Sequence, residues 1–176
     1  DRVHERASVL SAPMAHVVVL SDTHLRLGGR RRLPHTVYPH LDAADVILHA
    51  GDVLVGEVLD ELRGFAPVHA VLGNNDLELA GLLPEVCDLE IARVKLGMIH
   101  DSGPAKGRAG RMRRRFPGAE IVVFGHSHIP WNVPGLDGQL LFNPGSPTDR
   151  RSQPHHTLGT LDLVDGQLIA AAIHTV

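Results

Sequence analysis

The chain has 176 residues, with 17 Lys and Arg against 20 Asp and Glu, so its formal net charge is −3 at pH 7. This acidic balance argues against a general nucleic-acid binder, which is usually basic, and no apolar run has the length of a membrane span. One domain is expected at this length, and because aromatic residues make up only 3%, its core must rest on Val, Leu, Ile and Ala. Cys87, the single cysteine, has no internal disulfide partner and is interpreted as a small buried side chain in a strand.

The N-terminal residues differ in character from the rest of the chain. Residues 1–13 are mixed and charged, and Asp1 and Glu5 interrupt the basic leader that a signal peptide needs. We therefore expect residues 1–13 to be a loosely ordered extension upstream of a natural start at Met14. Residues 14–176 are expected to form one cytoplasmic domain.

Four short β-branched runs without polar alternation predict strands that are buried on both faces. They are residues 17–20, 46–48, 68–72 and 121–124. Each run is followed at once by a polar motif. Because ligands gather beyond the carboxyl ends of the strands in open α/β sheets, these motifs are expected at one rim.

Helix and turn signals separate these runs. Residues 57–63 predict a helix with its apolar side chains on one face, and residues 105–115 predict a basic surface helix. Later strands are predicted at 89–94 and 95–99, at 139–142, and at 158–164 paired with 167–174, with Asp137-Gly138 and Asp165-Gly166 as two-residue hairpin turns. The predicted fold class is α/β, with two packed mixed β-sheets flanked by helices.

The polar motifs supply carboxylates, side-chain amides and imidazoles. In chain order they are Asp22-Thr23-His24, Gly51-Asp52, Gly73-Asn74-Asn75-Asp76, His100 and Gly125-His126-Ser127-His128. Taken singly, each aspartate is also compatible with a loop or cap, His100 with a structural histidine, and the last pair with a mononuclear site. Together they favour a site for two divalent cations, which needs oxygen and nitrogen ligands from distant segments.

The ordered set D-x-H, G-D, G-N-x-D, H, G-H-x-H resembles the calcineurin-like metallophosphoesterases. The short length and Asn143-Pro144-Gly145-Ser146 resemble their small bacterial and archaeal phosphodiesterase branch, which includes the retromer subunit of eukaryotes. This resemblance implies the sandwich fold of that family and two metal ions, with manganese favoured and iron, nickel, cobalt or zinc as alternatives. It also implies two ligand groups, one formed by Asp22, His24, Asp52 and His128 and the other by Asp52, Asn74, His100 and His126.

Asp52 is the best candidate for a bridging ligand, because a carboxylate has two oxygens and Gly51 lets the backbone bend closely there. Metals lower the pKa of bound water toward ~7, so we expect in-line attack of a bridging hydroxide on a phosphodiester. Asp52, Asn74 and His100 are expected to carry the catalysis, with Asp76 as an outer-shell acceptor that orients an imidazole or amide. The alternative function is a non-catalytic interaction scaffold like the retromer subunit.

Two positions depart from the wider family. Asn75 stands where larger phosphatases usually have a His that protonates the leaving alkoxide, which favours substrates with good leaving groups such as aryl oxides. Asp101 follows His100 where the family typically has Gly, and it is either an outer-shell partner of His100 or solvated.

We interpret the remaining polar residues as solvated surface groups or turn residues rather than as parts of the site. The basic clusters at residues 30–32 and 111–115 either guide an anionic substrate or form solvated faces, and the acidic total favours the latter. Arg150 and Arg151 are read as a surface pair, and Asn143–Ser146 as a turn beside the rim. The residues expected to be solvated histidines are His4, His35, His40, His155 and His156. The expected partner is a small phosphodiester, with no nucleic acid or membrane; the natural substrate and the oligomeric state, including a homo-oligomer, stay open.

Overall fold

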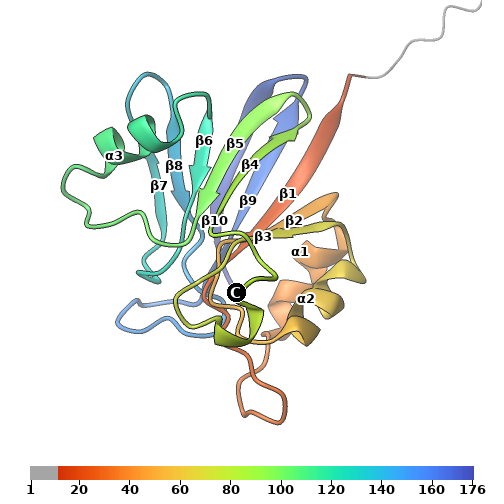
Figure 1. Ribbon diagram of the computed structural model, residues 1–176. Coiled ribbons are helices and arrows are strands. Elements are labelled where there is room, and N and C mark those ends of the chain that lie inside the picture. The colour runs from red at the N-terminus through yellow and green to blue at the C-terminus, as the bar shows by residue number, and fades with distance from the viewer. Residues whose placement is uncertain (1–11) are drawn as a thin grey trace, which may run out of the picture.

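The computed structural model describes residues 12–176 and contains two mixed β-sheets of five strands each (Figure 1). The first sheet has the order β10-β9-β1-β2-β3, with β1 (Met14–Leu20), β2 (Val46–His49), β3 (Val68–Ala70), β9 (Thr157–Val164) and β10 (Gln167–Thr175). The second has the order β4-β5-β6-β8-β7, with β4 (Val86–Ile91), β5 (Val94–Ile99), β6 (Ile121–Val123), β7 (Trp131–Pro134) and β8 (Leu140–Asn143). The predicted extension, residues 1–13, lies outside the described residues except for residues 12 and 13.

In each sheet the three strands that precede polar motifs run parallel to one another. These are β1, β2 and β3 in the first sheet and β5, β6 and β8 in the second, whereas the other pairings are antiparallel. Parallel neighbours end at the same edge of a sheet, so each sheet delivers three loops to one edge. The predicted pair of mixed sheets is confirmed.

Helices cover the two outer faces of the sheets (Figure 1). They are α1 (Tyr38–Asp42) and α2 (Gly56–Arg63) on the first sheet and α3 (Arg108–Arg115) on the second, with 3-10 turns at His35–Val37 and Leu77–Leu79. No helix within residues 12–176 is long and apolar enough to cross a membrane.

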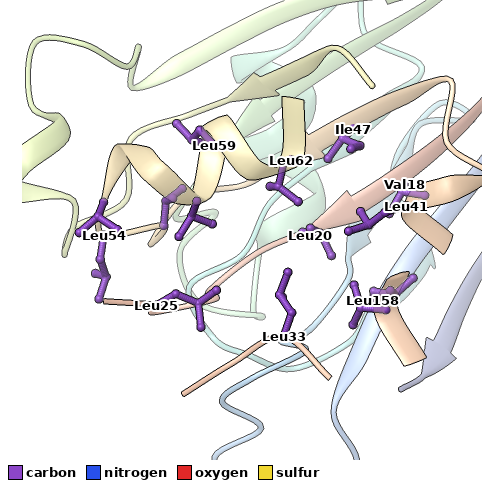
Figure 2. Packing of buried hydrophobic residues seen from close by; sticks show 14 of the residues in the cluster. Val18, Leu20, Leu25, Leu33, Leu41, Ile47, Leu54, Leu59, Leu62 and Leu158 are labelled. Carbon is purple, nitrogen blue, oxygen red and sulfur yellow. The ribbon is translucent and has the colours of Figure 1, made fainter. Parts of the chain in front are cut away.

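The core has three layers, and β1 contributes to two of them. Val17 and Val19 face the second sheet, whereas Val18 and Leu20 pack against the helices α1 and α2 on the other side (Figure 2). A third cluster places Met112 of α3 against the second sheet. Burial on both faces explains why the apolar run of β1 shows no alternation.

Both predicted Asp-Gly turns join antiparallel strands, β7 to β8 and β9 to β10. Their central residues have left-handed backbones, with φ of 54° and 77° at Asp137-Gly138 and 47° and 83° at Asp165-Gly166, as type I′ turns require. The hairpin from β4 to β5 turns in the same way at Ala92-Arg93, two residues earlier than predicted. Neither residue type favours this conformation, so the sequence carried no turn signal there.

Two local predictions are wrong in part. β3 is an edge strand in which His69 is exposed, so it is not buried on both faces. The basic helix starts at Arg108, after Gly107 with its φ of 75°, and Arg108 is buried rather than exposed. Its guanidinium lies over the rings of Phe124 and Trp131 at 4.9 and 4.6 Å, an arrangement that tolerates a charged group next to an apolar layer.

Cys87 lies in β4 and is only half-buried, less than predicted, and burial raises the pKa of its thiol. His35 and His155 are exposed, as expected for solvated histidines, whereas His40 and His156 are half-buried. His4 lies outside the described residues.

Candidate metal centre

Seven polar side chains from five loops meet at the rim where the two sheets adjoin. They are Asp22 and His24 after β1, Asp52 after β2, Asn74 after β3, His100 after β5, and His126 and His128 after β6. A hydrogen bond of 3.0 Å from the His126 backbone to Oδ2 of Asp22 joins the loops of the two sheets directly. The geometry therefore unites residues separated by up to 106 positions in the chain.

Asp22, His24 and His128 form a first compact group, in which one ligand-type atom of each lies within 4.8 Å of the others. Nε2 of His24 is 3.3 Å from Nε2 of His128, and the latter nitrogen is 3.4 Å from Oδ1 of Asp22. Asp22 and His128 are buried and His24 is half-buried. One cation can be reached by all three side chains.

Asp22, Asp52 and His100 form a second compact group by the same measure. Nε2 of His100 lies 3.5 Å from Oδ2 of Asp52 and 3.0 Å from Oδ1 of Asn74. That amide oxygen is also 3.0 Å from Nδ1 of His126. Asn74 and His126 thus extend the second group toward the outside of the rim.

Two carboxylate oxygens lie between the groups. Oδ2 of Asp52 is 3.5 Å from Nε2 of both His24 and His100. Oδ1 of Asp22 is 3.4 Å from Nε2 of His128 and 3.9 Å from Nε2 of His24 and of His100. Asp22 therefore faces both groups, whereas the family resemblance implies that it belongs to the first group only.

The environment of Oδ1 of Asp22 shows whether these residues fit a metal ion. This oxygen is buried and has no hydrogen-bond partner among the described residues, an arrangement that is costly unless a cation or another donor satisfies it. Carboxylate, amide oxygen and imidazole ligands suit divalent first-row metals. The donor set and the orphaned oxygen both fit a cation at this place.

Electrostatic coupling keeps both carboxylates ionised. Burial alone would raise the pKa of Asp22, but the close contact of its Oδ1 with Nε2 of His128 and the charge of His100 outweigh burial and lower the pKa. Burial is likewise outweighed at Asp52, whose pKa is held below its usual range by hydrogen bonds from His100 and Asn75. Two ionised carboxylates among imidazoles make the rim attractive to cations.

The histidines respond to the same charges in different directions. Burial works to lower the pKa of His100 and His128, yet their contacts with Asp52 and Asp22, respectively, raise it. At His24 the burial effect dominates and lowers the pKa. Metal binding would compete with protons at His100 and His128, because only neutral imidazole is a ligand.

Five of the seven side chains stand on left-handed backbone. The φ angles are 55° at Asp22, 46° at His24, 57° at Asp52, 69° at His126 and 61° at His128. Non-glycine residues seldom adopt this conformation, and such strain concentrates at functional sites. The sharp bends bring side chains of neighbouring residues in each motif into one centre.

Backbone carbonyl groups orient two of the imidazoles. Nδ1 of His100 lies 2.7 Å from the carbonyl oxygen of Ala50, and Nδ1 of His128 contacts the carbonyl oxygen of Asp149. A ring that donates from Nδ1 keeps Nε2 as the metal-ligating nitrogen. In both residues Nε2 is the atom that faces the carboxylates.

Asp76 does not orient an imidazole or a side-chain amide, in contrast to the expectation. It is buried and accepts three backbone N–H groups, from Asp52 at 2.9 Å, Leu54 at 2.7 Å and Gly73 at 2.7 Å. These donors belong to the loops after β2 and β3. Asp76 therefore sets the backbone path that carries Asp52, rather than a ligand's ring.

The two positions that depart from the family also occupy defined places. Asn75 donates its backbone N–H to Oδ1 of Asp52 at 2.8 Å and its side-chain Nδ2 to Oδ2 at 2.7 Å. Asp101 is exposed, accepts the N–H of Gly103 and lies 3.9 Å from Nε2 of His126. It is thus a neighbour of His126 and not an outer partner of His100.

Sequence reasoning missed the residues that support the first loop. His49 at the end of β2 is fully buried, and its Nε2 lies 3.1 Å from Oγ1 of Thr23, between Asp22 and His24. Burial lowers the pKa of His49 to about 4, so it is neutral at pH 7. The sequence feature that could have indicated this supporting role is a polar side chain at the end of an apolar run, three residues before Asp52.

The segment Asn143–Ser146 packs beside the rim, as its sequence suggests. Oγ of Ser146 donates to the carbonyl oxygen of Asp22 at 2.7 Å, and Nδ2 of Asn143 donates to the carbonyl oxygen of Gly125 at 3.0 Å. Arg150 and Arg151 are exposed, and Arg150 donates to the backbone of Gln153. The preferred surface interpretation of this arginine pair agrees with the structure.

Comparisons with known proteins agree with this geometry. Residues 15–166 match the family model of the calcineurin-like phosphoesterase superfamily domain. The chain belongs to this superfamily. It is 36% identical over 152 residues to a probable metallophosphoesterase of Methanocaldococcus jannaschii, covering 84% of this chain and 76% of that protein.

Solved structures of other proteins share the fold of this chain. Vps29 of Entamoeba histolytica, complexed with Zn2+, superimposes with a TM-score of 0.73 at 22% identity over 92% of this chain and 98% of its own. An archaeal phosphodiesterase gives a TM-score of 0.66 at 20% identity over 90% and 99%. At these identities the likeness concerns the fold, which carries more than one function.

Gly125 is expected to tolerate no side chain, because the loops are packed so closely at the rim. A Cβ at this position would overlap Oγ of Ser21 and lie 2.8 Å from Oδ2 of Asp22. Gly125→Ala should lower the Mn2+ affinity at least ~10-fold, in the range of changes around ligands, and destabilise the fold by about 1–3 kcal/mol. Calorimetric titration with Mn2+ and chemical denaturation measure the two effects.

Gly118→Ala is the matched control, because its Cβ would meet nothing within 4 Å. It should leave the Mn2+ affinity unchanged. Equal Mn2+ affinity in the two variants would mean that the loop after β6 adapts without moving the ligands, contrary to the packing argument.

Proposed function

We propose that the protein is a metal-dependent phosphodiesterase that hydrolyses a small phosphodiester at a centre of two divalent cations, with manganese favoured. The observation that carries the proposal is the position of Oδ2 of Asp52, 3.5 Å from an imidazole of each ligand group. A shared carboxylate between two groups is the arrangement that a dinuclear centre needs. Bound cations would supply Lewis acidity and lower the pKa of water at the centre.

The side chains take separate roles in this proposal. Asp22, His24, Asp52 and His128 would hold one cation, and Asp52, Asn74, His100 and His126 the other. Asp22 and Asp52 bring two negative charges against four positive ones, so the loaded centre keeps a net positive charge that attracts a phosphodiester anion. His49 supports the loop after β1 through Thr23. Asp76 fixes the backbone of the loops after β2 and β3.

A cavity beside the second ligand group provides room for the substrate. It has a volume of about 350 Å³ and is lined by Asn74, His100 and His126, with an apolar wall that includes Val86 and Ile99. This volume lies in the range of sites that bind small molecules. The apolar wall is suited to an organic leaving group.

Aryl phosphodiesters should be hydrolysed faster than alkyl phosphomonoesters, because Asn75 supplies no proton to a leaving alkoxide. Asn75→His should raise the rate most for poor leaving groups, within the ~10²–10⁴-fold range of general acid catalysis. The measurement is the dependence of kcat/KM on leaving-group pKa for both proteins. A shallow dependence in the wild type that Asn75→His leaves unchanged would show that another acid already serves.

The second candidate function is a non-catalytic, metal-bearing interaction scaffold. The fold likeness to Vps29 allows it, whereas the complete ligand set favours catalysis. An assay of bis(4-nitrophenyl) phosphate with added Mn2+ separates the two. Turnover that depends on Mn2+ supports the phosphodiesterase, and metal binding without turnover of any phosphoester supports the scaffold.

A further inference from the structure

The cavity beside the second ligand group continues into a basic groove. A second cavity of about 530 Å³ is lined by Arg111, Arg114 and Arg115. The two cavities share Ile99, Asp101 and Arg115. Arg115, the last residue of α3, thus borders the space that Asn74, His100 and His126 also line.

Arg115 is exposed and has no carboxylate within 4.0 Å among residues 12–176. Arg113, two residues earlier on the same helix, pairs with Asp137 at 3.2 Å. Arg111 donates to the backbone carbonyls of Ser102 and Lys106, which hold its guanidinium without cancelling its charge. A free guanidinium fork beside the cavity is suited to bind a phosphate oxygen pair.

The negative groups of the groove do not neutralise it. Asp101 and Glu85 line the cavities, against three arginines. Asp101 uses Oδ1 to accept the N–H of Gly103, and its Oδ2 faces His126. The groove therefore keeps positive potential on the side away from the ligand groups.

We infer that Arg115 binds a second phosphate group of the substrate, so that the preferred substrates are nucleotide-sized phosphodiesters that carry an additional phosphate. This inference rests on the proposed phosphodiesterase function and names its substrate class. The two ligand groups would hold the cations at the scissile phosphate, and the free guanidinium of Arg115, which lines the same cavity, binds the other phosphate. A phosphodiester with a single charge would leave Arg115 without a partner.

A pair of matched substrates tests the inference. They are thymidine 5′-(4-nitrophenyl phosphate) and the same ester with a 3′-phosphate, which differ only in the second phosphate group. The wild type with Mn2+ should show the higher kcat/KM for the 3′-phosphorylated ester, and Arg115→Gln should reduce this ratio about tenfold, as expected for loss of a charge-assisted hydrogen bond. Arg113→Gln, on the same helix but paired with Asp137, should keep the wild-type ratio.

An unchanged ratio in Arg115→Gln would overturn the inference while leaving the phosphodiesterase function intact. Faster cleavage of an oligothymidylate than of the nucleotide-sized ester would also overturn it, because the substrate would then be a strand. Calorimetry with thymidine 3′,5′-bisphosphate and thymidine 5′-monophosphate gives a readout without catalysis. If neither ester is hydrolysed but Arg115→Gln selectively weakens bisphosphate binding, the phosphate subsite stands and the proposed function fails.

Discussion

Asp52→Asn is expected to remove most of the Mn2+-dependent hydrolysis and to weaken binding of both cations. Oδ2 of Asp52 lies 3.5 Å from Nε2 of His24 and of His100, so one substitution affects both ligand groups. A neutral amide offers one oxygen and no charge, and it bridges two cations poorly. The loss of kcat/KM should exceed the ~10–100-fold typical of groups outside the ligand shell.

The control for Asp52→Asn is Asp60→Asn, which removes one negative charge from the exposed face of α2. It should leave both hydrolysis and Mn2+ binding unchanged. Calorimetric titration gives the number of Mn2+ ions bound by each variant. If Asp52→Asn loses one ion and binds the other with wild-type affinity, Asp52 serves a single metal and does not bridge.

Asp76→Asn is expected to act through the fold rather than through the metal. The carboxylate of Asp76 accepts three backbone N–H groups, two at Oδ2 and one at Oδ1. An amide in its place turns one acceptor into a donor, which leaves at least one buried N–H group without a partner. Such a group lowers the free energy of unfolding by about 1–3 kcal/mol. The backbone of the loop that carries Asp52 should also change its conformation.

Chemical denaturation of the metal-free proteins separates the two aspartates. Asp76→Asn should lower the free energy of unfolding clearly, whereas Asp52→Asn should change it little, because the Asp52 side chain accepts one backbone N–H group, that of Asn75. Hydrolysis by Asp76→Asn should fall as well, because Gly73 and Asp52 shift together. Wild-type stability combined with lost hydrolysis in Asp76→Asn would mean that Asp76 touches the chemistry directly.

Much of the architecture could be predicted because each apolar run forms a strand and each polar motif directly follows such a run. Runs such as 17–20 and 121–124 are apolar on both faces, so the pattern indicates sheets covered on both sides. A polar motif directly after each run then lies at a strand end. The convergence of the loops follows from parallel pairing, which the sequence implies but does not specify residue by residue.

The details that escaped prediction depend on backbone conformation and on contacts between distant residues. The left-handed φ of Asp22 or Asp52 is not specified by the local sequence, because Asp adopts this conformation more often than most residues but still only in a minority of cases. Whether Asp76 orients a ring or a set of N–H groups is decided by how two loops pack. The sequence around Arg108 indicates a surface charge, because the contacts of its guanidinium with the rings of Phe124 and Trp131 arise only in the folded structure.

A crystal structure of the protein with Mn2+, with the metals located by anomalous scattering, tests the proposed dinuclear centre directly. We expect two metal sites separated by ~3.5–4 Å, with Oδ2 of Asp52 between them. His24 and His128 should contact one metal, and His100 and Asn74 the other. A single site, or no site with these side chains dispersed at millimolar Mn2+, would contradict it.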